Sequence, residues 1–132
     1  MTSNDSQLLI LVVDDDERLA KVIEFVLKRG GYAVQTAFSG QSALDWLKRH
    51  TANVIILDLM MPDITGFNFL RQLRANPATP QVPVIVLTAR ADQESRLRSE
   101  AMGANDFLVK PVSSEALLEH VRQVLGQNDL LH

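Results

Sequence analysis

The sequence contains no cysteine, which excludes disulfide bridges and metal sites built from thiolates and is typical of a reducing compartment such as the cytoplasm. Aromatic residues are scarce, at 5% of 132 residues. No apolar run is long enough to cross a membrane. The apolar run nearest the N-terminus, Leu8–Val13, has no basic leader and ends in three aspartates, so we predict neither a signal peptide nor a membrane span.

An excess of positive charge is also missing. The 13 lysines and arginines are outnumbered by 16 aspartates and glutamates, which gives a net charge of −3. No basic surface therefore argues for direct binding of nucleic acid or of an anionic membrane. The length suits one globular domain. We expect a flexible N-terminus over residues 1–7, the domain over residues 8–125 and a tail over residues 126–132.

Five short apolar segments alternate with five stretches of helical periodicity. The predicted strands are Leu8–Val13, Tyr32–Ala37, Val54–Leu57, Val84–Leu87 and Phe107–Val109. Strands that are apolar on both faces are typical of a parallel sheet covered by helices on both sides. Because crossovers between parallel strands are right-handed, the pattern predicts a doubly wound α/β fold.

The predicted helices differ in how clearly they show an apolar face. They lie at residues 17–29, after Ser39-Gly40, after the turn Met61–Gly66, and at residues 91–102 and 114–125. In helix 17–29 the stripe predicted to face the sheet is Leu19, Val22, Ile23 and Val26. Helix 91–102 is highly charged, and its predicted apolar anchors are Leu97, Ala101 and Met102.

Polar residues follow four of the strands directly. The first strand runs into Asp14-Asp15-Asp16, the third into Asp58, the fourth into Thr88 and the fifth into Lys110-Pro111. The carboxyl ends of parallel strands share one edge of the sheet, where open α/β folds bind ligands. We therefore expect three carboxylates, a hydroxyl and an ammonium group to converge there.

Each of these residues has a plain structural reading by itself, such as a helix cap or a turn residue. Together they require compensation, because two like charges about 4 Å apart cost about 4 kcal/mol at an effective dielectric constant near 20. Lys110 supplies one positive charge. Oxygen ligands select Mg²⁺, which would supply the rest.

Four motifs in order resemble those of one protein family. They are Leu-Val-Val-Asp14-Asp15-Asp16, Val-Ile-Ile-Leu-Asp58-Leu-Met-Met-Pro62, Val-Leu-Thr88-Ala89 and Phe-Leu-Val-Lys110-Pro111. This set is similar to the receiver domains of two-component response regulators, over roughly residues 8–125. The resemblance implies a flavodoxin-like receiver fold, with a five-stranded parallel sheet in the order 2-1-3-4-5 and five helices.

The resemblance also implies a role for each acidic position. Asp58 corresponds to the phosphoacceptor, a carboxylate nucleophile that forms an acyl phosphate. Asp15 would bind Mg²⁺ directly and Asp14 largely through water. The backbone carbonyl of Met60 would be the third protein ligand of the metal.

The remaining motif residues correspond to the phosphoryl contacts and the switch. Lys110 would pair with phosphoryl oxygens, and the Thr88 hydroxyl and Ala89 N–H would reach the phosphoryl group once it is present. Phe107 occupies the position of the aromatic residue that turns inward behind Thr88. The resemblance further implies a cis peptide bond at Lys110-Pro111.

As a receiver, the chain would be a phosphoacceptor signalling domain rather than an enzyme acting on an external substrate. Its partners would be a histidine kinase or a histidine phosphotransfer protein, and a downstream protein or a fused output domain. Phosphorylation would shift the face formed by residues 91–125, and a homodimer through that face is one option. The sequence leaves open whether the receiver stands alone or belongs to a longer protein.

Three other readings were compared with this one. A phosphatase of the haloacid-dehalogenase type would use Asp14 and Asp16, but Arg18 stands where that motif needs Thr or Val. A flavodoxin-like mononucleotide binder needs a loop rich in N–H donors after the first strand, where this chain has aspartates that repel phosphate. A receiver that acts only by protein interaction would share the whole fold and would not be phosphorylated.

Overall fold

The computed structural model describes residues 7–79 and 81–126. The expectations for the N-terminus and the tail fall almost entirely outside these residues. Five strands form one parallel sheet in the order β2-β1-β3-β4-β5, as expected. The strands are β1 (Leu9–Val13), β2 (Ala33–Ala37), β3 (Val54–Leu57), β4 (Val84–Thr88) and β5 (Asp106–Val109).

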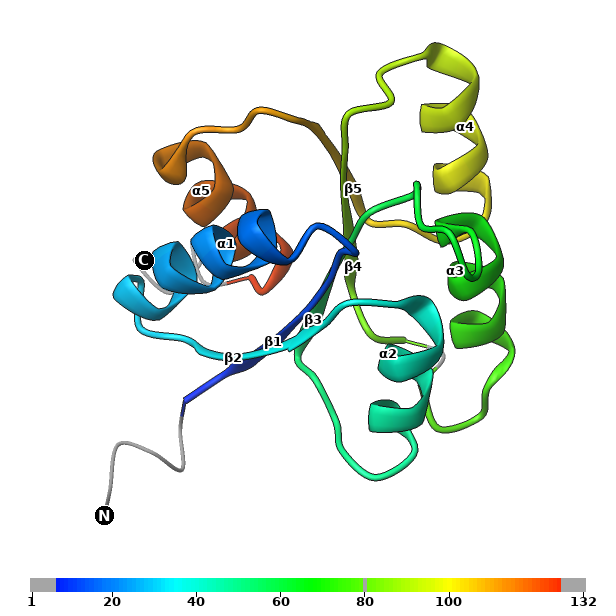
Figure 1. The fold of residues 1–132 in the computed structure, drawn as a ribbon, viewed down its shortest axis with the longest axis horizontal. Helices are drawn as coiled ribbons and strands as arrows, with labels where there is room; N and C mark the ends of the chain where they lie inside the picture. Colours follow the sequence, from blue (N-terminus) through cyan, green and yellow to red (C-terminus); the bar gives the residue numbers. More distant parts are fainter. Residues whose placement is uncertain (1–6, 80, 127–132) are drawn as a thin grey trace.

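Helices α1 to α4 connect successive strands, α5 follows β5, and together these helices cover both faces of the sheet (Figure 1). Helices α1 and α5 lie together on one face, and α2, α3 and α4 lie on the other. This arrangement gives the doubly wound α/β fold that the alternating sequence pattern predicts. The helices are α1 (Glu17–Arg29), α2 (Gly40–Leu47), α3 (Gly66–Ala75), α4 (Gln93–Ala101) and α5 (Ser114–Val124).

The hydrophobic core consists of two clusters, one on each face of the sheet. Alternate residues of the central strands enter opposite clusters, so that Ile10 and Val12 pack under α1 and α5 while Leu11 and Val13 pack under α2 and α3. The three central strands β1, β3 and β4 are almost completely buried. They form a rigid support for the residues that follow them.

Every helix begins with a side-chain cap. In each case a short polar side chain accepts a hydrogen bond from the backbone N–H of the third residue after it, which satisfies one of the free N–H groups of the first turn. The capping residues are Asp16, Ser39, Thr65, Asp92 and Ser113. Short side-chain caps therefore fix where each of the five described helices starts.

Two of the predicted helix faces are partly wrong. Val22 of α1 is 58% exposed, although Ile23, its neighbour in the predicted stripe, is buried. In α4, Leu97 is 53% exposed and Ala101 is also exposed, so neither anchors the helix. The buried face of α4 instead carries two serines, Ser95 and Ser99.

Helix α4 contacts neighbouring elements through two cation–π pairs, while the hydroxyls of its buried serines bond within the helix and its cap. Ser99 Oγ donates to the Arg96 carbonyl oxygen, and Ser95 Oγ donates to the capping carboxylate of Asp92. The Arg96 guanidinium lies 5.0 Å from the centre of the Phe107 ring, and that of Arg98 lies 4.1 Å from the Phe67 ring. Each such contact contributes about 0.5–1 kcal/mol at an exposed site. The buried face of α4 is thus formed by two serines rather than by large apolar side chains.

No helix among the described residues is both long enough and apolar enough to span a membrane.

A pair of leucine truncations should separate the two kinds of helix. Leu97→Ala is expected to change the free energy of unfolding by no more than about 0.5 kcal/mol, because the side chain is exposed. Leu70→Ala, in the fully buried face of α3, should cost about 2–5 kcal/mol. Urea denaturation followed by circular dichroism measures both values. A cost for Leu97→Ala as large as that for Leu70→Ala would show that α4 packs in the predicted register after all.

Candidate functional site

The polar residues that follow the strands are fixed by the backbone hydrogen bonds of the sheet. The Asp14 N–H donates to the Ala37 carbonyl at 3.1 Å, and the Asp58 N–H donates to the Val13 carbonyl at 3.0 Å. In the same way the Lys110 N–H donates to the Thr88 carbonyl at 2.8 Å. The sheet ladder thus continues one step beyond three of the strands and holds Asp14, Asp58 and Lys110 at its carboxyl edge.

Lys110 lies between two carboxylates. Its Nζ atom is 2.9 Å from Asp14 Oδ2 and 2.9 Å from Asp58 Oδ2. Both carboxylates are buried, and the lysine side chain is only 18% exposed. One ammonium group therefore compensates two negative charges in a place that water reaches poorly.

Burial and charge shift the pKa values of this group in a consistent way. Burial is the largest influence on Asp14 and raises its pKa, and repulsion by Asp58 raises it further. The Lys110 ammonium and the Asp16 N–H lower the pKa, but they offset the rise only in part. Burial alone would lower the pKa of Lys110, but its contacts with Asp14 and Asp58 outweigh burial and raise it. Lys110 thus stays charged at neutral pH, while the ionised form of Asp14 is less favourable than that of an exposed aspartate.

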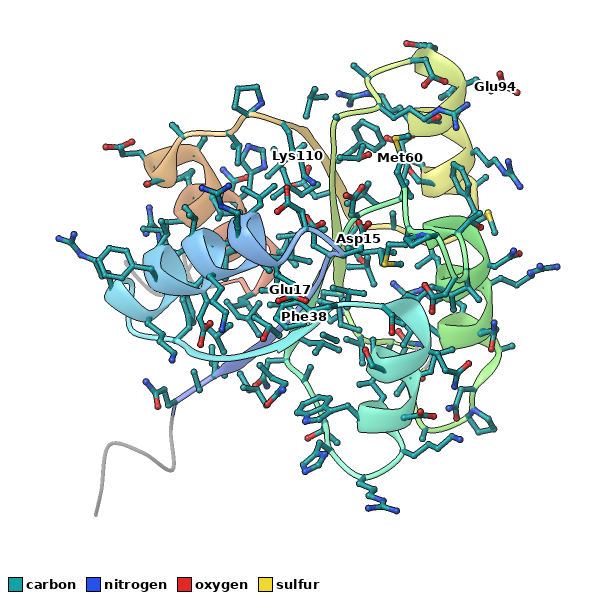
Figure 2. The ribbon with its side chains drawn as sticks, in the orientation of Figure 1. Asp15, Glu17, Phe38, Met60, Glu94 and Lys110 are labelled. Carbon is teal, nitrogen blue, oxygen red and sulfur yellow. The ribbon has the colours of Figure 1, made fainter. Side chains whose placement is uncertain are left out.

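The other carboxylate oxygens accept backbone N–H groups. Asp14 Oδ1 accepts from Asp16 at 3.0 Å, and Asp58 Oδ1 accepts from Met60 at 3.1 Å. Asp15 is exposed beside them. Asp14, Asp15 and Asp58 each present a carboxylate oxygen, and these oxygens lie within 4.8 Å of one another. Figure 2 shows Asp15, Met60 and Lys110 near the ends of the strands, between the two helical layers.

This donor set suits a hard divalent cation. The cluster offers carboxylate oxygens only, which favour Mg²⁺ over softer metals. The net charge of the three carboxylates and Lys110 is negative, so a bound cation would remove the remaining repulsion. The residues present therefore fit the predicted metal.

The residues predicted to contact a phosphoryl group or to switch lie on the neighbouring strands. Thr88 is the last residue of β4 and is fully buried, and its Oγ1 accepts the Arg90 N–H at 3.2 Å. Ala89, directly after it, is exposed. Phe107 of β5 is buried beneath the Arg96 guanidinium. The Lys110-Pro111 peptide bond is cis, as expected.

Sequence reasoning missed the importance of Gly66, which closes the loop after Asp58. A Cβ atom at this position would lie 2.5 Å from Leu59 Cα and 2.7 Å from the Asp58 carbonyl oxygen. These are backbone atoms and cannot move aside. The close approach lets the Gly66 N–H donate to the Leu59 carbonyl at 3.0 Å. The sequence signal that could have revealed this role is the position of Gly66 at the end of a turn that contains Pro62 and Asp63.

A second missed group lies between Thr88 and α4. Arg90 Nε is 3.0 Å from Asp92 Oδ1, and Asp92 also caps α4 by accepting from Ser95. The Arg90 backbone and side chain therefore connect the Thr88 hydroxyl with the first turn of α4. The sequence shows these residues as ordinary charged positions, because their pairing depends on the path of the loop.

Comparison with known proteins agrees with this geometry. The sequence profile described as "Response regulator receiver domain" matches residues 10–122. Two curated relatives are the phosphate regulon transcriptional regulatory protein PhoB of Rhizobium meliloti, 37% identical over 88% of this chain, and the response regulator ArlR of Staphylococcus aureus, 38% identical over 88%. The chain spans about half the length of these relatives, 51% and 52%.

Solved structures give the same result for the fold. The chemotaxis protein CheY4 of Vibrio cholerae is 33% identical to this chain and superposes with a TM-score of 0.85, covering 89% of this chain and 98% of that one. The receiver domain of DrrB, in a BeF3-activated state, gives a TM-score of 0.82 at 32% identity, covering 91% and 98%. The fold, the site geometry and the matched profile together place this chain in the family of response regulator receiver domains of two-component systems.

Proposed function

We propose that this receiver domain accepts a phosphoryl group on Asp58 in an Mg²⁺-dependent reaction, and that phosphorylation changes its affinity for a downstream partner. The observation that carries the proposal is the pairing of Lys110 with both Asp14 and Asp58, at 2.9 Å each. A purely structural ion pair would need one carboxylate. The second carboxylate leaves an excess of negative charge that suits a cation and, with it, a phosphoryl group.

In this reaction an oxygen of Asp58 attacks the phosphorus atom of the donor. A phosphorus–oxygen bond to Asp58 forms while the bond from phosphorus to the donor atom breaks. Lys110 compensates negative charge on the phosphoryl oxygens as a point charge. The Ala89 N–H and the Thr88 hydroxyl donate hydrogen bonds to these oxygens. The Thr88 oxygen accepts from Arg90 and still has its own proton to donate.

The residues proposed to hold the metal are Asp14, Asp15, Asp58 and the backbone carbonyl of Met60. Bound Mg²⁺ would neutralise carboxylate and phosphoryl charge at this edge of the sheet. The chain itself contributes the positions of the ligands, through the sheet hydrogen bonds of Asp14 and Asp58 and the N–H of Met60. The exposure of Asp15 gives the cation and its water ligands access to the cluster.

We propose that the phosphodonor is a histidine kinase or a histidine phosphotransfer protein that docks beside Lys110. A groove of about 200 Å³ opens there, between α1 and the loop that joins β5 to α5. Val22, Phe25 and Val26 border this groove and an adjoining hollow, and Val22 and Phe25 are 58% and 61% exposed. Exposed apolar side chains beside a concave surface are typical of a site for a partner helix.

The output is proposed to pass through Thr88, Phe107 and α4 to the face formed by residues 91–125. One charge-assisted hydrogen bond contributes about 1.5–3 kcal/mol. A complete change from 1:99 to 99:1 needs about 5.5 kcal/mol. We therefore expect phosphorylation to produce a graded population shift, which a downstream protein, an output domain or a second copy of the chain completes.

A receiver that works only by protein interaction is the alternative. It is less well supported because the described site contains an acidic cluster, a lysine and a hydroxyl in the arrangement that phosphorylation needs. Both proposals predict the same fold and a cytoplasmic protein with no direct contact to nucleic acid or membrane. Phosphorylation of Asp58 is the difference between them.

Incubation with acetyl phosphate and Mg²⁺ should add the mass of one phosphoryl group to the parent protein and none to Asp58→Asn. Asparagine keeps the size of the side chain and cannot form the acyl phosphate. Intact mass spectrometry under mild conditions measures both proteins. Asp45→Asn, which removes an exposed carboxylate from α2, is the matched control and should label like the parent. A parent that stays unlabelled with acetyl phosphate and with a panel of phosphorylated kinases would favour the interaction-only alternative.

Asp14→Asn should raise the melting temperature of the metal-free protein at neutral pH and reduce the further rise that Mg²⁺ causes. Because the pKa of Asp14 is raised in the folded state, the folded protein holds this proton more tightly than the unfolded chain. The stability of the parent should therefore increase as the pH falls toward the raised pKa, and Asp14→Asn should lose that dependence. Differential scanning fluorimetry, with and without Mg²⁺, measures both effects. A lower melting temperature for metal-free Asp14→Asn would contradict the expected repulsion.

Phe25→Ser should slow phosphotransfer from a protein donor by about tenfold or more, as expected for loss of an interface anchor. Labelling by acetyl phosphate should not change, because Phe25 is not part of the carboxylate cluster and lines the hollow beside Arg29 and Leu118. The donor is the kinase that labels the parent fastest in a panel of purified histidine kinases. Leu97→Ser, which removes an exposed apolar side chain from the opposite layer, is the control. Equal slowing by both variants would exclude a donor site specific to the α1 groove.

A further inference from the structure

The loop between β3 and α3 carries two of the proposed site residues, Asp58 and Met60. The ends of the loop are fixed, because the Asp58 N–H bonds to the Val13 carbonyl and the Gly66 N–H bonds to the Leu59 carbonyl. The segment between them, residues 60–65, lies outside the sheet ladder and is not part of a helix. Met61 is buried in the hydrophobic core, and the mostly exposed remainder of the segment depends on contacts of its own.

Asp63 connects the middle of this loop to the start of α2. Its Oδ1 accepts the Gly40 N–H at 3.2 Å, and its Oδ2 accepts the Gln41 N–H at 2.9 Å. These are the first two residues of α2, where backbone N–H groups lack partners within the helix. Both oxygens of the carboxylate are used, and hydrogen bonds to a charged acceptor are stronger than neutral ones.

The ionisation of Asp63 agrees with this geometry. Slight desolvation of this exposed side chain would raise its pKa, but the backbone N–H groups of Gln41, Ile64 and Gly40 outweigh it and lower the pKa. The carboxylate therefore remains charged at neutral pH and faces the positive end of a helix. Its charge is directed to α2, and Asp63 is not a member of the cluster formed by Asp14, Asp15 and Asp58.

An apolar contact joins the same two segments. A Cβ atom at Gly40 would lie 2.2 Å from Ile64 Cγ1, 2.6 Å from Ile64 Cδ1 and 3.5 Å from Met61 Cε. The loop therefore packs directly on the first residue of α2, and the absence of a side chain at Gly40 makes this possible. The hydrogen bonds of Asp63 and the packing of Ile64 hold the loop from the same side.

We infer that Asp63 is a positioning residue for the metal site, which holds the β3–α3 loop against α2 so that Met60 stays beside the carboxylate cluster. The inference rests on the proposed Mg²⁺ site. Mg²⁺ tolerates little departure from octahedral geometry, so a displaced loop weakens binding even when every carboxylate ligand is present. The Met60 N–H also bonds to Asp58 Oδ1, so the position of the loop orients the proposed nucleophile as well.

The test compares Mg²⁺ affinity in Asp63→Ala, Asp63→Asn and the parent by isothermal titration calorimetry. Asp63→Ala should weaken binding by about 10–100-fold, the range found when groups that orient metal ligands are removed. Asp63→Asn keeps one oxygen acceptor for an N–H of α2, so its Mg²⁺ affinity should lie between those of Asp63→Ala and the parent. Asp45→Ala is the matched control, because it removes an exposed carboxylate of α2 that bonds to the Gln41 side chain rather than to the loop.

The melting temperature of each metal-free variant separates positioning from general stability. Asp63→Ala with a lower melting temperature and unchanged Mg²⁺ affinity would overturn the inference, since Asp63 would then be a structural brace only. Weakened affinity in Asp63→Ala, with partial recovery in Asp63→Asn and none of the effect in Asp45→Ala, supports it. A parent protein that does not bind Mg²⁺ would overturn the proposed metal site, and this inference with it.

Discussion

The contact of one ammonium group with two buried carboxylates is the constraint on which the rest of this structure depends. Neighbouring strands lie about 4.8 Å apart, so β5 is roughly 10 Å from β3 and farther from β1 in the observed order. Only a long side chain can reach from the end of β5 past β4 to Asp14 and Asp58. Lys110 does so because all three residues continue the sheet hydrogen bonds. The geometry of the site therefore follows directly from the order of the strands.

The same contact explains why the site is open to further positive charge. Burial makes the ionised form of Asp14 costly, and Lys110 offsets only part of that cost. Replacing the charges by apolar residues would remove this cost, as it often does for buried ion pairs. A site that keeps two buried carboxylates and one exposed carboxylate around a single lysine is better suited to binding a cation than to stabilising the fold.

The sequence predicted the strands and the edge of the sheet well, because both depend on local signals. A strand buried on both faces must be apolar throughout, so the polar residues after Val13 and Leu57 mark where β1 and β3 end. Packing at the surface could not be predicted in this way. Helical spacing alone placed Leu97 inward, whereas Ser95 and Ser99 are the buried residues of α4 and its arginines contact the rings of Phe107 and Phe67.

Contacts between distant loops were also beyond the sequence. Arg74 of α3 donates to the carbonyl oxygens of Val82 and Gly103, which belong to two different loops. Asp63 likewise finds its partners at the start of α2, more than twenty residues away. Such pairings depend on where separate loops meet, and neither side chain differs by type or neighbours from a solvated charge.

The light anchoring of α4 gives a reason why a weak contact at the proposed phosphoryl site would be transmitted. A helix held by a continuous apolar face would resist displacement by several kcal/mol, since each buried leucine contributes about 1.5–3 kcal/mol. Helix α4 buries serines there, and its two cation–π contacts contribute about 0.5–1 kcal/mol each. Arg90 joins the Thr88 hydroxyl to Asp92, the capping residue of α4, because it donates a hydrogen bond to each of them. Under the proposed function, a hydrogen bond of about 1.5–3 kcal/mol to a phosphoryl group would be comparable with these contacts and would change the population of α4 positions.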